Sequence, residues 1–185
     1  MISTNDFRTG VSVIVEGQIW TVVDFQHVKP GKGSAFVRTR LKNLIRGNVL
    51  EKTFRAGEML PRAIIDTREM QYLYNSGDEW HFMDKTNYEQ IHLGKEALGE
   101  NTDLLKEGVT IDVQFHDGKV ISASLPNHIE LEVTQTDPGF RGDTATNITK
   151  PATLETGAVV QVPIFINPGD TIRIDTRDRK YISRV

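Results

Sequence analysis

The group in this sequence best placed to act on another molecule is the amine of Lys32. It stands between Gly31 and Gly33 in the stretch HVKPGKGSAFVRTR. Pro30 stiffens the entry to this loop, while the two glycines permit positive φ angles and leave no side-chain bulk beside the lysine. Together with Lys29, these residues predict a hairpin apex that presents one cation at an extended tip. The alternative is a lysine that serves solubility, which is ordinary at a loop tip.

The strand that follows this loop carries further cations. Strand alternation divides the segment AFVRTRLKNL into two faces. One face carries Phe36, Arg38, Arg40 and Lys42, and the other carries Ala35, Val37, Thr39 and Leu41. A face with three closely spaced cations suits phosphate better than it suits protein packing. We therefore predict that Arg38, Arg40 and Lys42 contact a nucleic-acid backbone.

The sequence contains few combinations of residues that could support enzymatic chemistry. The histidines fall in separate elements without H-x-x-x-H or H-E-x-x-H spacing: His27, His81, His92, His116 and His128. No G-x-S-x-G elbow occurs. A P-loop needs Gly at position 26 and Ser or Thr at position 33, where Gln26 and Gly33 stand. We expect no enzymatic activity, no catalytic residue, no metal and no cofactor.

One acidic segment contains side chains of the types that bind metals. Its members are Asp78, Glu79, His81 and Asp84. Alternation along EWHFMD sends neighbouring side chains to opposite faces, so an acidic hairpin is the simpler interpretation.

Composition indicates which cellular compartment the protein occupies. The 185 residues include no cysteine, which excludes a disulfide framework and thiolate chemistry and favours a reducing interior. The start MISTNDF lacks the charged and apolar regions of a secretory signal. The densest apolar runs, such as VSVIV, are far shorter than the ~20 residues that cross a bilayer. We expect a cytoplasmic protein without a membrane span.

The net charge of -3 is divided unevenly along the chain. Residues 1–63 carry ten lysines and arginines against five acids, a balance of +5, whereas residues 64–127 have a balance of -7 and residues 128–185 a balance of -1. A basic third can be a solvated face. We favour the alternative, in which the N-terminal part approaches a polyanion and the middle part limits indiscriminate binding.

Period-two alternation between glycine turns predicts strands along most of the chain. Turns at Glu16-Gly17 and at residues 46–48 favour a small antiparallel barrel or SH3-like sheet at the N-terminus. The pattern breaks near Pro61, so we place a boundary at about residues 61–66. Further hairpins are predicted at residues 75–78 and at Asp117-Gly118. The spacing of apolar residues in YEQIHLGKEALGENTDLL predicts short helical turns.

We therefore expect the all-β class, with three small β-barrel domains at residues 1–64, 65–127 and 128–185. A weak internal echo supports the division. The pattern L-x-x-G before an alternating strand occurs at residues 105–113 and again at residues 154–162. Duplicated five-stranded barrels of the oligonucleotide/oligosaccharide-binding (OB) type would explain it. The alternative is common turn chemistry.

Seven ordered motifs, spread over essentially the full length, resemble those of one family. They are NDFRTG (5–10), KPGKGSAF (29–36), EKTF (51–54), QYLY (71–74), TDPGFRGDTA (136–145), KPAT (150–153) and IDTRDRKYISRV (174–185). The sequence resembles bacterial translation elongation factor P. The resemblance implies an L-shaped, tRNA-like arrangement of three β-barrel domains, the first SH3/KOW-like and the other two OB-folds.

The resemblance also implies a function. Such a protein binds the 70S ribosome between the P and E sites, next to the P-site tRNA and rRNA, and stimulates peptide bond formation at polyproline stretches. The resemblance implies neither a cofactor nor a membrane partner, and we expect a monomer. The alternative is a cytosolic RNA-binding protein of KOW and OB build that acts away from the peptidyl transferase centre.

Residue roles follow from the same resemblance. Lys32 would reach toward the CCA end of the P-site tRNA and would be the target of a lysine-modifying enzyme. Tyr181 and Arg184 resemble residues that touch the tRNA. The basic tail to which they belong favours RNA, with Arg177, Arg179, Lys180 and Arg184 close together.

A further loop resembles one that faces the E-site codon. Its residues are Gly142, Asp143 and Thr144. Asn147-Ile148 departs from the glycine-rich run that is usual there, which puts the flexibility of the loop in doubt.

Overall fold

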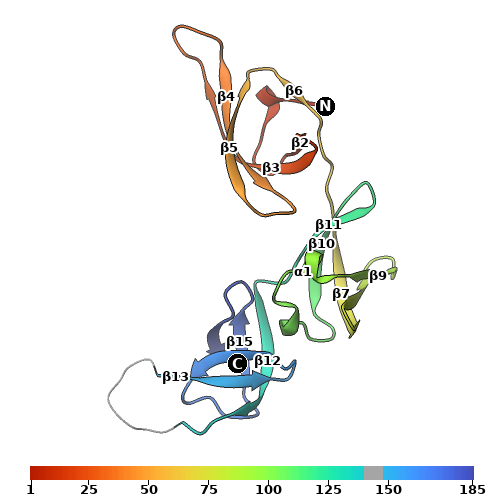
Figure 1. The fold of residues 1–185 in the computed structure, drawn as a ribbon, viewed down its shortest axis with the longest axis vertical. Helices are drawn as coiled ribbons and strands as arrows, with labels where there is room; N and C mark the ends of the chain where they lie inside the picture. The colour runs from red at the N-terminus through yellow and green to blue at the C-terminus, as the bar shows by residue number, and fades with distance from the viewer. Residues whose placement is uncertain (140–147) are drawn as a thin grey trace. The chain divides into compact units, whose positions relative to one another are not determined.

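The computed structural model describes residues 1–139 and 148–185 of the chain. Their regular secondary structure is almost entirely β-strand (Figure 1). Two compact units are present, the first formed by residues 1–67 with 114–122 and the second by residues 68–113 with 123–185. No helix of the described residues is long and apolar enough to cross a membrane. The all-β class is confirmed.

The first unit is built on a four-stranded antiparallel sheet. Its strands are β2 (Ser12–Val15), β3 (Gln18–Val28), β4 (Phe36–Asn43) and β5 (Val49–Arg55), in the order β2-β3-β4-β5. A short pair, β1 (Ile2–Ser3) with β6 (Met59–Leu60), and a bridge between Val13 and Arg62 curl this sheet into a barrel-like form. The 3₁₀ turn η1 (Thr4–Asp6) follows β1.

Inward side chains of these strands form one core. Its members include Phe7, Val13, Trp20, Val22, Val37, Leu41 and Phe54. The predicted turn Glu16-Gly17 joins β2 to β3, with φ angles of 52° and 74°. Two residues with positive φ match the twist of a two-residue hairpin, and glycine takes up that conformation without steric cost. The same turn chemistry recurs at Asp117-Gly118.

The middle of the chain forms a five-stranded antiparallel sheet with the order β11-β10-β7-β8-β9. Its strands are β7 (Asp66–Ser76), β8 (Glu79–Asp84), β9 (Gln90–Leu93), β10 (Thr110–His116) and β11 (Lys119–Ser124). Helix α1 (Lys95–Leu98) and the 3₁₀ turn η2 (Thr102–Leu104) confirm the short helical turns. The part of that prediction that included Ile91 is wrong, because this residue lies in β9.

The third sheet has the order β14-β13-β12-β15-β16. Its strands are β12 (His128–Thr136), β13 (Thr149–Leu154), β14 (Val159–Pro163), β15 (Thr171–Asp175) and β16 (Lys180–Arg184). In chain order both five-stranded sheets therefore read 5-4-1-2-3, so the architecture is duplicated. The repeated L-x-x-G pattern that suggested a duplication does not reflect this duplicated strand order. It matches β10, a fourth strand, to β14, a third strand, and so reflects common turn chemistry.

A joint between the second and third sheets lies within the second unit. Leu104 of η2 is fully buried in the hydrophobic core that β12 to β16 form. Beside it, the Asn101 side chain donates to the carbonyl of Thr176 at 2.8 Å, and the Arg179 guanidinium donates to both carboxylate oxygens of Asp103 at 2.7 and 2.8 Å. The loop after α1 thus supplies a core residue to the neighbouring sheet.

Truncation of this core residue should loosen the third sheet, although Leu104 lies outside it in sequence. We expect Leu104→Ala to lower the free energy of unfolding of β12 to β16 by about 2–5 kcal/mol, because the change leaves a cavity in a fully buried position. Urea unfolding followed by the NMR amide signals of β15 measures it. Val159→Ala, at a 52% exposed position of β14, is the matched control and should change stability by less than about 0.5 kcal/mol. Equal effects of the two changes would contradict the joint.

Candidate nucleic-acid interface

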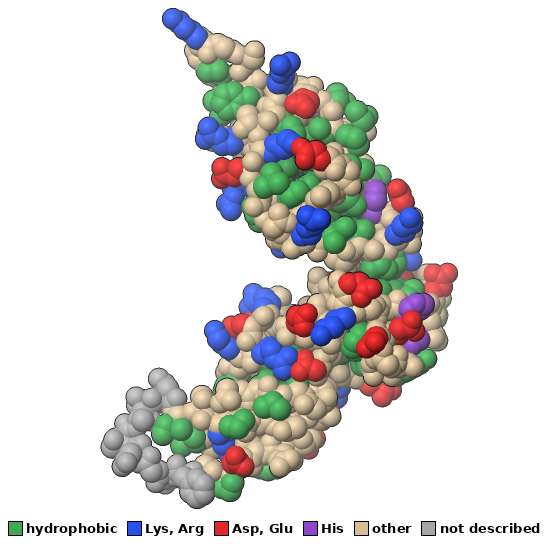
Figure 2. All heavy atoms as spheres, in the orientation of Figure 1, with side chains coloured by type: hydrophobic (Ala, Val, Ile, Leu, Met, Phe, Trp, Pro, Cys, Tyr) green, Lys and Arg blue, Asp and Glu red, His purple; other side chains and the backbone are tan. Residues whose placement is uncertain are grey.

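The first element of the interface is the long hairpin of β3 and β4. These strands pair from Trp20 with Asn43 to Val28 with Phe36. The connecting residues Lys29 to Ser34 are all exposed, and the loop projects beyond the rest of the sheet (Figure 1). Figure 2 shows Lys and Arg side chains at this projecting end of the first unit. Lys32 therefore sits at the end of a two-stranded arm.

The two glycines of the tip differ in conformation. Gly33 has a φ of +108°, which side-chain-bearing residues rarely adopt. Gly31 is outside the positive-φ region, and the space around its Cα is open. Of the two glycines that permit positive φ, Gly33 is the one that adopts it. The backbone conformation therefore favours glycine at position 33, whereas position 31 has room for a side chain.

The cationic face of β4 is confirmed as a geometric feature. Arg38, Arg40 and Lys42 are exposed, and Val37, Thr39 and Leu41 between them are buried. The buried Thr39 hydroxyl donates to the carbonyl of Lys52 at 2.6 Å. The inner residues thus hold the strand against the core while the outer ones face solvent.

Strand register gives the three cations of this face different neighbours. Toward the tip, Arg38 lies between the uncharged Gln26 of β3 and Thr53 of β5. Arg40, in the middle of the row, lies between Asp24 and Glu51. Opposite charges on neighbouring strands offset one another, so the charge of Arg40 is offset.

Lys42 is the member of the row farthest from the tip. It lies between the uncharged Thr21 and Val49, so its charge, like that of Arg38, has no opposite charge at the paired positions of the adjacent strands.

Arg55 is an additional cation that sequence reasoning did not assign to the face. It pairs with Phe36 across β4 and β5 and is exposed. Directly opposite residues share a face of a sheet, so Arg55 joins Arg38 near the tip. Alternation in EKTFR shows that Arg55 points outward, but the register alone places it beside β4.

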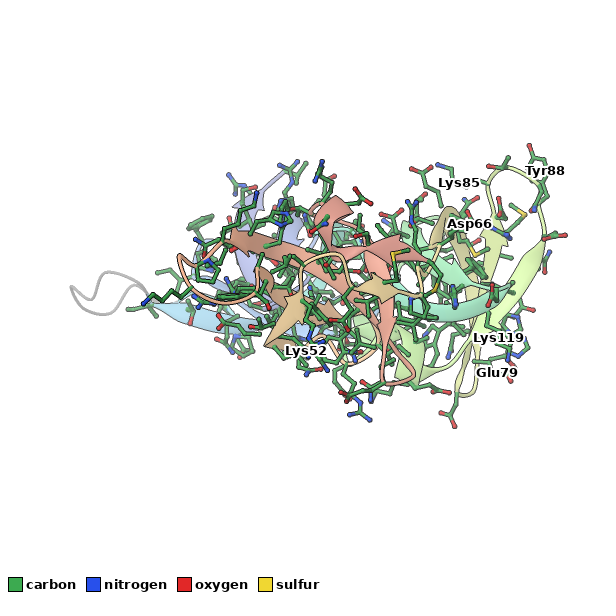
Figure 3. All side chains as sticks on the ribbon, turned by 90° about the horizontal axis from the view of Figure 1, so that it is seen from above. Lys52, Asp66, Glu79, Lys85, Tyr88 and Lys119 are labelled. Carbon is green, nitrogen blue, oxygen red and sulfur yellow. The ribbon has the colours of Figure 1, made fainter. Side chains whose placement is uncertain are left out.

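Lys52 belongs to the other face. This residue, labelled in Figure 3, pairs with Thr39 across the sheet and forms an ion pair with Glu16 at 2.8 Å. The hydrogen bond from Lys52, and then its charge, lowers the pKa of the Glu16 carboxyl. The charge of Lys52 is therefore matched by that of Glu16 within the protein.

The cations of the basic tail lie beside acidic groups. Each of them has a carboxylate partner: Arg177 with Asp175, Arg179 with Asp103, Lys180 with Asp178 and Arg184 with Asp170. The hydrogen bonds from Arg177 hold the pKa of Asp175 well below its usual range. These pairs offset part of the positive charge, and the expectation that the tail favours RNA stays a prediction.

Tyr181 and Arg184 remain near one another on β16. Tyr181 is half-buried and packs against the core of the third sheet. The exposed Arg184 lies 3.9 Å from Asp170, the longest of the four pairs, and its guanidinium lies 5.7 Å from the ring centre of Phe165. Arg184 is thus the tail cation that is held least tightly.

The predicted codon loop, Gly142, Asp143 and Thr144, lies outside the described residues. Two described residues that flank it are joined, because the amine of the buried Lys150 donates to the carbonyl of Asp137 at 2.6 Å. Among the described residues there is no group of three or more His, Cys, Asp or Glu that is arranged to hold a metal ion.

Comparison with known families accounts for nearly the whole chain. Three models match in order: the Elongation factor P (EF-P) KOW-like domain at residues 3–60, the Elongation factor P (EF-P) OB domain at residues 65–123, and Elongation factor P, C-terminal, at residues 129–184. The chain belongs to the elongation factor P family. It is therefore a translation factor.

Relatives of the elongation factor P family match end to end. Elongation factor P of Pelotomaculum thermopropionicum is 57% identical over 185 residues, and that of Moorella thermoacetica is 58% identical over 184 residues, with all of both chains covered in each case. A solved translation initiation factor eif-5a family protein from Naegleria fowleri shares the fold at 15% identity. Its TM-score is 0.54, and the match covers 67% of this chain and 96% of that one.

The tip glycines of this elongation factor P family member offer a matched pair of substitutions. Gly33→Ala should lower the free energy of unfolding by about 1 kcal/mol or rearrange the tip, because a Cβ disfavours the φ of +108°. Gly31→Ala should change it by less than about 0.5 kcal/mol. Urea unfolding and the NMR shifts of residues 29–35 measure both effects. An unchanged tip in Gly33→Ala would contradict the assigned conformation.

Proposed function

We propose that this protein binds the ribosome between the P and E sites, next to the P-site tRNA, and stimulates peptide bond formation at polyproline stretches. Its Lys32 tip positions the CCA end of the peptidyl-tRNA. The observation that carries the proposal is the arm itself: an exposed cation at the end of paired β3 and β4, with the exposed Arg38 and Arg55 on the strands near it. Membership of the elongation factor P family supports it.

The mechanism requires no proton transfer by the protein. Proline is a constrained and poor nucleophile, so a slow step can be accelerated by holding its partner in a reactive pose, which removes part of the entropic barrier. A hundredfold acceleration corresponds to only ~2.7 kcal/mol. A lysine ammonium offers three donors on a flexible stem and can engage phosphate or ribose oxygens.

The cationic face of β4 supplies orientation. Arg38 and Lys42 have uncharged neighbours in both adjacent strands, and Arg38 is the one nearer the tip; Arg40 lies between them in the same row. Contacts to the backbone of tRNA or rRNA fix the register of a protein without reading sequence. Tyr181, Arg184 and the segment with Gly142, Asp143 and Thr144 remain proposed contacts of the C-terminal domain.

The tip also suits covalent modification. Lys32 is exposed and flanked by glycines, so a lysine-modifying enzyme can approach it without displacing neighbouring side chains. A longer side chain would extend the reach of the arm. In this proposal the protein acts as a cytoplasmic monomer with domains at residues 1–64, 65–127 and 128–185.

Loss of the tip amine tests the proposal directly. Lys32→Ala should abolish relief of stalling on a Pro-Pro-Pro message, because the positioning contact disappears, and toeprinting in a reconstituted translation system measures it. Arg46→Ala is the matched control, since this exposed cation lies in the β4–β5 turn, at the opposite end of the sheet from Lys32. If Lys32→Ala relieves stalling as well as the parent, the tip mechanism is wrong and the protein is an RNA-binding factor that acts away from the peptidyl transferase centre.

Removal of one cation from the face tests its contact with phosphate. We expect Arg38→Ala to weaken ribosome binding about tenfold, the loss of one charge-assisted hydrogen bond, and to lower the salt slope of log K by about 1. Lys52→Ala removes a cation from the opposite face, where it is paired with Glu16, and should leave both quantities unchanged. Filter binding at several salt concentrations measures them, and an equal loss in the two variants would argue against a specific face.

A further inference from the structure

Three planar side chains lie in a row across the middle sheet. Tyr74 of β7 stacks on His81 of β8, with ring centres 4.5 Å apart and planes 15° apart, and His81 lies 6.1 Å from His92 of β9. The register pairs His81 with both neighbours. We name these three residues the ring ladder. The ladder lies on the outward face of β7 to β9.

A β-bulge puts the first ring on this face. Tyr72 pairs with Phe82, but Tyr74 pairs with His81, so Leu73 is an extra residue in β7. Side chains alternate with a period of two, so without the bulge Tyr74 would point to the same inner face as Tyr72. Instead Tyr72 is 8% exposed and Tyr74 is 53% exposed. The bulge therefore turns the ring of Tyr74 toward solvent and leaves Leu73 without a partner residue on β8.

Acidic groups surround the ladder. A carboxylate oxygen of Glu79 lies 3.9 Å from Nε2 of His92. Tyr74 also borders an open hollow of about 710 Å³ whose lining includes Glu107 and the pair of Lys106 with Glu155. In Figure 2, acidic and histidine side chains gather on the part of the second unit over β9.

The cations of the middle segment do not offset this charge. Residues 64–127 have twelve acids and five lysines and arginines. Among the five, Lys85 pairs with Glu69, Lys95 with Glu100 and Lys106 with Glu155. The segment therefore presents excess negative charge, the opposite of the face around Arg38.

We infer that the ring ladder and Glu79 form a docking surface for arginine side chains of a basic protein segment. A guanidinium plane stacks on aromatic rings and pairs with a carboxylate through parallel hydrogen bonds. Lysine, a compact point charge, gains less from stacking. OB sheets commonly bind oligonucleotides on this set of strands. Here the surrounding acids repel phosphate, so the charge favours a basic protein. The inference does not depend on Lys32.

A titration of the full chain tests this surface. Hexa-arginine, hexa-lysine and hexa-uridylate are added separately at 150 mM salt, and amide NMR shifts report where and how tightly each one binds. We expect hexa-arginine to perturb residues of β7, β8 and β9 around the ladder and to bind about three- to tenfold more tightly than hexa-lysine.

Substitutions assign the site. Tyr74→Ala and Glu79→Gln should each weaken hexa-arginine binding about three- to tenfold, whereas Tyr88→Ala should change it less than twofold. Tyr88 is the matched control because it is a 69% exposed tyrosine of the β8–β9 turn, and Figure 3 shows it well apart from Glu79. Equal binding by Tyr74→Ala and the parent, equal losses in Tyr74→Ala and Tyr88→Ala, or tighter binding of hexa-uridylate at the ladder would each overturn the inference.

Discussion

The antiparallel pairing of β3 with β4 is the constraint on which the first unit depends. A slip of one residue would turn Val37 and Leu41 into solvent and Arg38 into the core, and burial of an unpaired guanidinium is prohibitive. The same ladder of hydrogen bonds extends to Val28 and Phe36 and carries the exposed loop away from the sheet. Core packing therefore fixes at once the direction of the cations and the position of the tip. The register of β3 with β4 therefore sets both the packing of the core and the position of the tip on which the proposed function depends.

In the second unit, long-range contacts join the loop after α1 to the third sheet. Leu104 fills the core of the third sheet, and Arg179 reaches Asp103 from the opposite side of the joint. The Arg179–Asp103 pair places an acidic group beside a cation of the tail. Salt bridges at partly exposed sites contribute little to stability individually, so the buried Leu104 contributes more to the stability of the joint than this pair does.

Two faces of opposite charge give the protein two kinds of surface. The β4 face combines cations with an exposed lysine and suits phosphate, whereas the β7–β9 face combines aromatic rings with carboxylates and suits guanidinium groups. Neither arrangement offers a nucleophile beside a base or a set of metal ligands among the described residues. Family membership makes the protein a translation factor, and the proposed effect on peptide bond formation rests on positioning.

The sequence alone determined what depends on neighbours along the chain. Alternation separated Arg38 from Val37 because strand side chains have a period of two, and Glu16-Gly17 specified a turn because few residues accept positive φ. Register and long-range pairing were decided only by the tertiary structure. It placed Asp24 and Glu51 beside Arg40, brought Arg55 to the tip, paired Arg179 with Asp103 across 76 residues, and turned Tyr74 outward through a bulge. These features depend on which strands meet and at which residue, and the packing of whole sheets decides that, whereas local propensity does not.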